Sequence, residues 1–184
     1  MPNLSVRLLV LVGALVIAAA TLIRPTTANA KSNRVAVLTQ IVGARDETWR
    51  WQRLMGKPQT PTVYSERTVT SSAYRLWLRE LWQKRANRAA RRASTPPHRA
   101  AWLCIHRYER DPAQGWTTRT GNGFYGGLQM GLSFQRSYGG DLLQTKGTAD
   151  RWSPLEQMWV AERAHRSGLG FWPWPNTARY CGLI

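Results

Sequence analysis

The sequence predicts an α+β protein that is mostly helical, in which a basic helical segment precedes a compact domain closed by one disulfide. Three observations support this prediction. Apolar residues recur at helical spacing in several stretches, residues 117–129 are glycine-rich and suit a short hairpin, and the 184-residue chain contains two cysteines. The boundaries that follow divide the chain into residues 1–30, 31–99 and 100–184.

The start of the chain has the pattern of a signal peptide, residues 1–30. Arg7 precedes an uncharged apolar run over residues 8–23, and Ala28 and Ala30 form a small-residue cleavage site. The run is shorter than the roughly 20 residues that a membrane span needs. We therefore expect a protein that is cleaved near Ala30 and secreted or located in the cell envelope. An uncleaved membrane anchor is the alternative.

The two cysteines are expected to pair, because an exported chain enters an oxidising compartment where disulfides persist. A bridge between Cys104 and Cys181 would join the first helix of the second half to the C-terminus. The chain-entropy model gives such a long loop roughly 4–5 kcal/mol of stabilisation. Two separate buried thiols are the alternative. Thiols at this spacing do not form a zinc site, so neither a metal nor another cofactor is expected.

Positive charge is concentrated before the second half. Residues 31–100 carry 15 basic and 4 acidic residues, whereas residues 101–184 carry 9 and 6. A strongly basic surface favours polyanions. For an exported protein these are anionic wall polymers or a lipid surface, and no nucleic acid is expected. The alternative is a solvated surface that only keeps the protein soluble.

The basic region is predicted to be partly helical. A tether over residues 31–40 leads to a short helix over residues 46–55, which residues 56–58 end. A loop over residues 58–70 precedes the clearest helix, over residues 72–92. Five apolar side chains of this helix form one stripe: Tyr74, Trp77, Leu78, Leu81 and Trp82. We expect the stripe to pack on a neighbouring core, and a helix lying on a membrane surface is the alternative.

The second half begins with a helix over residues 98–109, for which Thr95 is the expected N-cap. A glycine-rich hairpin follows, and then a helix over residues 127–138 that the pair Gly139 and Gly140 is expected to close.

A capping box, Ser153-Pro154-Leu155-Glu156, opens the last helix, which we expect to end at Gly168. The aromatic side chains of Trp172 and Trp174 are expected to support the disulfide.

A carboxylate lies on an apolar face of the helix over residues 98–109, where Trp102, Ile105, His106 and Glu109 share one face. Apolar surroundings disfavour the charged form of a carboxyl and raise its pKa, which suits a general acid. The alternative is an ion pair with the arginines that flank Glu109. His106 is not expected to bind a metal, because no second histidine lies at ligand spacing.

The segments around this glutamate resemble the resuscitation-promoting factor family. The resemblance lies in residues 102–109, in Trp116 and in Thr-Gly-Asn-Gly-Phe-Tyr-Gly-Gly-Leu-Gln-Met over residues 120–130, and it covers about residues 100–184. Members of the family are lysozyme-like wall enzymes of actinobacteria. The resemblance implies a compact lysozyme-like fold, a glycan cleft and a single catalytic glutamate, which is Glu109 here.

The match departs from the family at two places. Tyr108 stands where the family usually has a cysteine, and the link from the glutamate to Trp116 is two residues longer. Two aromatic residues, Trp116 and Tyr125, are expected to stack on sugars, whereas Thr120 and Gln129 are expected to form hydrogen bonds with them. Core packing is the alternative for Trp116.

The mechanism depends on the number of carboxylates, since glycosidases usually pair an acid with a second Asp or Glu. Asp111 is predicted to point away from the face of Glu109, Glu156 to cap its helix, and Glu162 to be paired inside the helix packing. A single carboxylate suits lytic transglycosylation, although water could instead complete hydrolysis.

We therefore expect an enzyme, a muramidase or lytic transglycosylase, that cleaves the β-1,4 bonds of peptidoglycan glycan strands. The basic region, residues 31–99, would hold it on anionic wall polymers or a lipid surface, and a partner endopeptidase is left open. The alternative is a non-catalytic wall- or membrane-surface-binding protein that retains the lysozyme-like fold.

Overall fold

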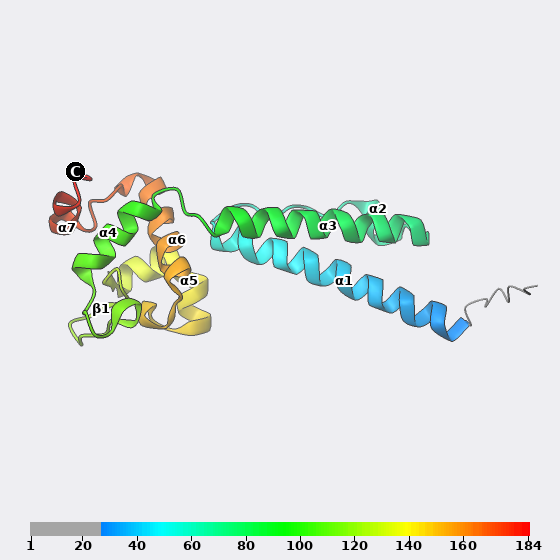
Figure 1. Cartoon of the computed structure of the whole chain (residues 1–184), viewed down its shortest axis with the longest axis horizontal. Helices are drawn as coiled ribbons and strands as arrows, with labels where there is room; N and C mark the ends of the chain where they lie inside the picture. Colours follow the sequence, from blue (N-terminus) through cyan, green and yellow to red (C-terminus); the bar gives the residue numbers. More distant parts are fainter. Residues whose placement is uncertain (1–26) are drawn as a thin grey trace, which may run out of the picture.

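The structure, a computed structural model, describes residues 27–184, which form a helical arm (residues 27–93) and a compact domain (residues 98–184) (Figure 1). The arm contains helices α1 (Thr27–Leu54), α2 (Tyr64–Thr68) and α3 (Ser72–Ala93). The domain contains α4 (Arg99–Glu109), η1 (Gly115–Thr117), β1 (Phe124–Tyr125), β2 (Met130–Gly131), α5 (Leu132–Lys146), η2 (Ala149–Arg151), α6 (Pro154–Ala164), η3 (His165–Leu169) and α7 (Pro175–Tyr180). The predicted mostly helical α+β class is confirmed.

Most of the predicted signal peptide lies outside the described residues, and its last four residues form the first turn of α1. Among residues 27–184, no helix is sufficiently long and apolar to cross a membrane.

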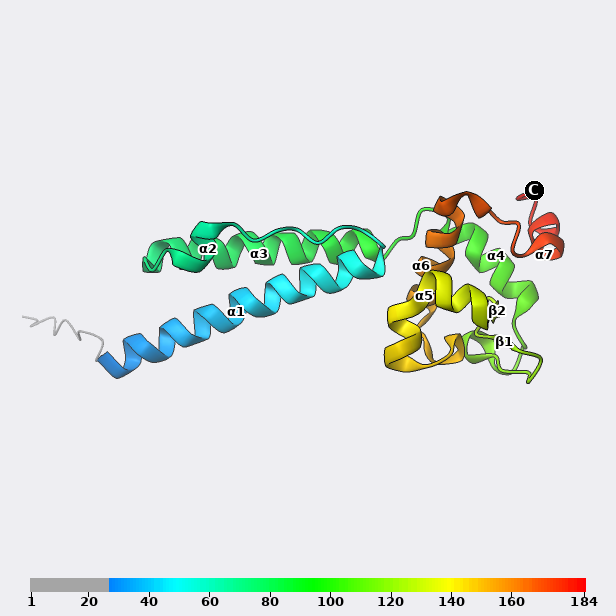
Figure 2. The ribbon, with the colours of Figure 1, turned by 180° about the vertical axis from the view of Figure 1, so that it is seen from behind.

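Helices α1 and α3 run in the same direction along the arm (Figures 1 and 2). Near the middle of α1, Ile41 packs against Leu78 and Trp82 of α3 in one buried cluster. At the domain end, Met55 and Ala93 share a second cluster. The parallel course requires the chain to travel back along the arm, which it does through residues 55–71, here called the return segment.

Hydrogen bonds hold the return segment to both long helices. The indole of Trp49 donates to the carbonyl of Thr60 at 2.8 Å, and the indole of Trp82 donates to Glu66 at 3.1 Å. The amide of Gln52 exchanges two hydrogen bonds with Thr60, at 2.7 and 2.9 Å. The return segment is thus a third layer of the arm beside α1 and α3.

The prediction of a tether and a separate short helix is wrong, because α1 is continuous from Thr27 to Leu54. Residues 31–40 contain neither Gly nor Pro, so nothing in them interrupts a helix. The predicted end is confirmed, and Gly56 adopts a φ of 62°, which favours glycine after a helix. The predicted loop over residues 58–70 contains the short helix α2.

The predicted helix over residues 72–92 is confirmed as α3, and the Ser71 hydroxyl caps it by accepting a hydrogen bond from Tyr74 N at 3.1 Å. Its stripe packs on a core as expected through Leu78 and Trp82, which are buried. Trp77 lies at the edge of the stripe and is 54% exposed.

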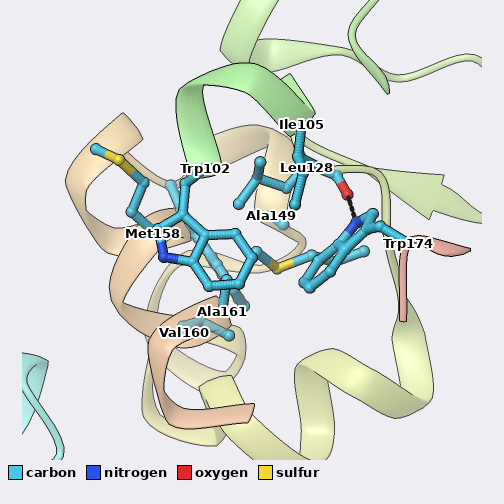
Figure 3. Close-up of a cluster of buried hydrophobic side chains, with 10 residues drawn as sticks. Trp102, Ile105, Leu128, Ala149, Met158, Val160, Ala161 and Trp174 are labelled. Carbon is cyan, nitrogen blue, oxygen red and sulfur yellow. Dashed lines mark hydrogen bonds between the residues drawn. The ribbon is translucent and has the colours of Figure 1, made fainter. Parts of the chain in front are cut away.

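Ten buried residues form the core of the domain (Figure 3). Trp102 and Ile105 of α4 face Val160 and Ala161 of α6 in this cluster. The indole of Trp174 donates to the carbonyl of Leu128 at 2.6 Å, a bond drawn in Figure 3. This bond joins the C-terminal segment to the hairpin.

The predicted helix over residues 98–109 is confirmed as α4, but His98 and not Thr95 is in the cap position. The reason is Glu162, which is fully buried in α6. Its carboxylate accepts hydrogen bonds from His98 N at 2.7 Å and from the Trp102 indole at 2.9 Å. The predicted pairing of Glu162 is confirmed, and it satisfies the first turn of α4 in place of a local cap.

The predicted hairpin is the antiparallel pair β1–β2, in which Tyr125 lies opposite Met130. The next helix, α5, begins at Leu132 and not at residue 127 as predicted, and the glycine pair interrupts it without ending it, since Gly139 has a non-helical φ of −127° and the helix continues to Lys146. A Cβ at Gly139 would lie 2.5 Å from the ring of Trp152. This glycine therefore permits close packing and does not end the helix.

The capping box before α6 is confirmed, since Ser153 Oγ accepts from Glu156 N and Glu156 Oε2 accepts from Ser153 N. The helix continues into η3, where Gly168 has a φ of 101° close to the predicted end. The predicted disulfide is also confirmed: Cys104 of α4 is bonded to Cys181 after α7, with Cα atoms 6.0 Å apart.

The base of the arm docks on α6 and η3. The indole of Trp159 donates to the carbonyl of Ala93 at 2.7 Å, and both residues are buried with Met55. Arg166 donates to the Met55 carbonyl at 2.6 Å. The ends of α1 and α3 are thus both bonded to the domain.

Candidate active site

A cleft of about 290 Å³ lies where the end of α4 meets the hairpin and the start of α7. Its lining consists of Glu109, Asn122, Phe124, Gln129, Pro173, Trp174, Pro175 and Asn176. Among these residues of the described chain, Glu109 is the only acidic one. The cleft therefore combines one carboxylate with amide groups and flat apolar side chains.

Glu109 is the last residue of α4, because Arg110 is extended at φ −74° and ψ 149°. Its side chain is half-buried, and Thr177 Oγ1 donates a hydrogen bond to Glu109 Oε1 at 2.7 Å. Thr177 is itself buried, at 8% exposure. The carboxylate is thus held from one side by a hydroxyl whose position the core fixes.

The disulfide sets this contact. Glu109 lies five residues after Cys104, and Thr177 lies four residues before Cys181, so α4 and α7 run in opposite directions on either side of the bridge. Thr177 is not among the residues that the sequence predicted for the site. Its position one helical turn before Cys181 is the signal that would have indicated it once the bridge was assumed.

The Gly-Gly pair of the hairpin is required by close packing. A Cβ at Gly126, where φ is 77°, would lie 2.5 Å from Gln157 Oε1, and a Cβ at Gly127 would overlap the ring of His106. The Gln157 amide donates to three backbone carbonyls, those of Trp116, Ala149 and Trp152. Gly126 lets the hairpin approach this buried glutamine, and Gly127 lets it approach the ring of His106.

Gln129 is the one predicted contact residue that lines the cleft. It adopts a φ of 48°, and no other non-glycine residue within 27–184 has a positive φ. Its side-chain amide donates to the Gly126 carbonyl at 2.9 Å. Backbone conformations of this kind cost free energy and concentrate at functional sites, which agrees with a role for Gln129 in binding.

The structure places the other three predicted contacts outside the cleft lining. Trp116 stacks on His106 with ring centroids 3.8 Å apart, which is the packing alternative. Thr120 is exposed in the loop before β1, and Tyr125 is half-buried against the core.

Strand alternation explains why Phe124 replaces Tyr125 in the lining. Successive side chains of a strand point to opposite faces. Tyr125 packs on the core, so its neighbour Phe124 faces the cleft and is 49% exposed. The tail agrees with expectation only in part: Trp174 lies in the core against which Cys181 packs and also lines the cleft, whereas Trp172 is 62% exposed.

Two other carboxylates considered for the mechanism, Asp111 and Glu156, are engaged in contacts of their own. Asp111 Oδ1 accepts from Ala113 N at 2.8 Å and from Gln114 N at 3.0 Å, which turns the loop after α4. Glu156 binds Lys146 at 2.6 Å as well as its own helix start, and Lys146 helps to lower the pKa of its carboxyl against the effect of burial. Within residues 27–184, no three His, Cys, Asp or Glu side chains are grouped as metal ligands.

The ring of His106 packs against the hairpin that lines the cleft. Burial lowers its pKa, and the hydrogen bond to the Gly127 carbonyl at 3.0 Å opposes that shift. The ring connects α4 to the hairpin between Gly127 and Trp116.

Residues 98–175 match the family model of the transglycosylase-like domain. The match begins at the cap of α4 and includes Glu109, the hairpin and the start of α7. It supports a lysozyme-like transglycosylase family for this segment, and a peptidoglycan-cleaving kind of function. The arm and the last residues, among them Thr177 and Cys181, lie outside it. No curated protein and no solved structure matches the chain. The narrower resemblance to resuscitation-promoting factors stays a prediction.

Proposed function

We propose that this protein is an exported enzyme that cleaves the β-1,4 bonds of peptidoglycan glycan strands, with Glu109 as its catalytic acid. The observation that supports this most is the composition of the cleft. Its one acidic side chain is Glu109, and it lies in the segment that matches the transglycosylase-like domain.

The reaction begins when Glu109 donates its proton to the glycosidic oxygen while the bond between that oxygen and the anomeric carbon of muramic acid breaks. The carboxylate that remains then takes a proton from a hydroxyl of the same muramic acid. The oxygen of that hydroxyl bonds to the anomeric carbon and closes an anhydro ring. Glu109 is protonated again, and no atom is lost or gained overall.

The anhydro route is favoured because no second carboxylate lines the described cleft. Hydrolysis would need a water molecule to replace the sugar hydroxyl, and enzymes that hydrolyse usually orient it or the sugar with a second Asp or Glu. Amide groups of Asn122, Gln129 and Asn176 suit the hydroxyl and N-acetyl groups of the sugars. Phe124, which is 49% exposed, offers a flat apolar face.

Export rests on the signal-peptide pattern of residues 1–30 and agrees with the bond between Cys104 and Cys181, since disulfides persist outside the reducing cytoplasm. Sequencing the N-terminus of the secreted protein tests it, with Lys31 expected as the first residue. A mature protein that still begins at Met1 would favour the anchor.

The catalytic test compares Glu109→Gln with Glu80→Gln, which changes an exposed carboxylate of the arm. We expect Glu109→Gln to lower the rate of peptidoglycan cleavage by about 100-fold or more, because a general acid contributes roughly 10²–10⁴-fold. Glu80→Gln should retain the wild-type rate, and both variants should still bind purified peptidoglycan. Wild-type protein that binds but does not cleave would support the non-catalytic alternative.

Mass spectrometry of the digest decides the route. Anhydro products, one water lighter than products with reducing ends, are expected. Reducing ends alone would replace transglycosylation by hydrolysis.

A further inference from the structure

We propose that the arm binds phosphate groups in a cavity between α1, the return segment and α3. The cavity has a volume of about 210 Å³ and is here called the cationic cavity. Its lining consists of Thr48, Gln52, Met55, Lys57, Thr60, Arg85, Arg88, Ala89 and Arg92. Four of these residues are cations, and none in this described lining is acidic. The inference rests on the proposed attachment of the arm to anionic polymers or lipid, and it does not depend on Glu109.

Helical spacing brings the cations together. Arg85, Arg88 and Arg92 lie at i, i+3 and i+7 of α3, and so share one face. Ala89 lies between them and leaves space, while Lys57 approaches from the return segment. Like charges that line one cavity repel one another, so a bound anion would stabilise the arrangement.

The carboxylates of the arm neutralise this group only weakly. Among residues 27–184, the one ion pair of the four cations joins Arg85 to Glu66, at 3.8 Å. Glu66 is already bound by the indole of Trp82. By contrast, Arg50 forms a close pair with Glu47 at 2.6 Å outside the cavity.

Arg85 contains a buried donor that forms no hydrogen bond. Its Nη1 atom is buried, and the nearest carboxylate oxygen given for it within residues 27–184, Glu66 Oε1, lies 3.8 Å away, beyond hydrogen-bond distance. The guanidinium lies 4.6 Å from the ring centroid of Trp82, which holds it in place. A buried donor without a hydrogen bond is unfavourable, and an anion oxygen within reach of the guanidinium would satisfy it.

The uncharged walls narrow the class of ligand. The Gln52 amide is occupied by Thr60 on both sides, and the Thr48 hydroxyl donates to the Ala44 carbonyl. We therefore expect the four cations to bind the ligand. Planar guanidinium groups bind phosphate oxygens in pairs, and several of them suit a tetrahedral anion such as a phosphomonoester or phosphodiester.

The cavity also lies at the base of the arm. Met55 lines it, packs against Trp159 of the domain and has its carbonyl bound by Arg166. A phosphate polymer or lipid headgroup held there would lie beside the transglycosylase-like domain.

Calorimetric titration of the full chain with inorganic phosphate tests the proposal. We expect saturable binding that Arg88→Gln with Arg92→Gln weakens by about tenfold or more, because charged hydrogen bonds are lost. The matched control, Lys84→Gln with Arg91→Gln, removes the same charge from exposed positions of α3 outside the cavity. It should change the affinity by less than about twofold. Arg88→Lys with Arg92→Lys retains the charge and, without the guanidinium fork, should bind with intermediate affinity.

Two further binding experiments identify the source of the phosphate. Vesicles of phosphatidylglycerol are compared with vesicles of phosphatidylcholine, and cell walls are compared before and after removal of their phosphate polymers. If the Arg88→Gln, Arg92→Gln variant selectively loses binding to the vesicles or to the cell walls, the result supports phosphate binding in the cationic cavity and identifies the source of the phosphate. Equal loss in the control pair, or no saturable phosphate binding by the wild type, overturns the proposal.

Cleavage of soluble glycan by each variant separates this inference from the proposed activity. The cavity variants should cleave at the wild-type rate, and Glu109→Gln should bind phosphate with wild-type affinity. Phosphate binding and glycan cleavage are therefore tested separately, so one proposal can fail while the other holds.

Discussion

The domain and the arm are stabilised in different ways. The domain has a continuous core of ten buried residues, and buried polar side chains such as Gln157 and Glu162 bond its segments to one another. One disulfide connects its first helix to its last. The arm has smaller clusters, of which the central one contains Ile41, Leu78 and Trp82. Its remaining surface is strongly basic.

The two regions also differ in what a single substitution can do. In the domain, the proposed chemistry depends on one carboxylate whose place is fixed by contacts from distant parts of the chain. In the arm, basic residues are repeated along the helices, so the proposed phosphate binding depends on which of them line the cationic cavity. This difference predicts that changes to the domain are local and large, whereas changes to the arm need pairs of residues.

Removal of the disulfide should have the largest effect. Replacing both Cys104 and Cys181 by alanine opens a loop with a sequence separation of 77. We expect the free energy of unfolding of the domain to fall by about 4.5 kcal/mol on the chain-entropy model. Chemical denaturation followed by tryptophan fluorescence measures this value. The helical signal of the arm should persist after the domain unfolds, and a single transition for both regions would contradict the separation drawn here.

Trp159→Phe should have the next largest effect, because it tests the connection between the two regions. The change removes the indole donor and leaves the Ala93 carbonyl buried without its partner, at a cost of about 1–2 kcal/mol. Hydrogen exchange should then increase in residues 94–98, while the core of the domain stays protected. Trp77→Phe on the exposed edge of α3 is the control. Unchanged exchange in residues 94–98 would mean that Arg166 alone holds the base of the arm.

Sequence patterns predicted the domain better than the arm, for physical reasons. The helix that contains Glu109, the capping box at Ser153 and the disulfide each depend on local spacing or on a pair of unique residues. The continuity of α1 could not be predicted from amphipathicity, since residues 31–40 are almost entirely exposed. The parallel course of α1 and α3 depends on contacts of the return segment, such as that of Trp49 with Thr60.

Sequence patterns also predicted only some of the residues that line the cleft. Glu109 and Gln129 were identified by sequence, but Tyr125 was chosen where Phe124 faces the cleft, a difference of one residue in strand alternation. Thr177 could not be chosen without knowledge of how α4 and α7 face each other. Such contacts are set by the tertiary structure, which local patterns do not describe.

Thr177→Val tests whether a single side chain of the domain positions Glu109. Valine has nearly the same shape but lacks the hydroxyl that donates to Glu109. We expect kcat for peptidoglycan cleavage to fall about tenfold, which corresponds to the roughly 1.4 kcal/mol of one hydrogen bond to a charged group, with little change in KM. Thr177→Ser should restore most of the rate. A rise in KM at constant kcat would instead indicate that Thr177 contributes to glycan binding.

The smallest effect concerns pH, and it separates the two regions because all three histidines of the chain lie in the domain. Burial lowers the pKa of His106, and it also lowers the pKa of His165, where His98 adds to the shift. The unfolded chain, with histidine pKa values near about 6.5, therefore binds more protons than the folded domain as the pH falls below that value. The stability of the domain should decrease over this range, whereas that of the arm should not. His106→Phe keeps a ring against Trp116 and should flatten the dependence in part, since His165 still titrates. Parallel pH dependence of both regions, measured by thermal unfolding between about pH 7 and pH 5, would show that the domain histidines are not its cause.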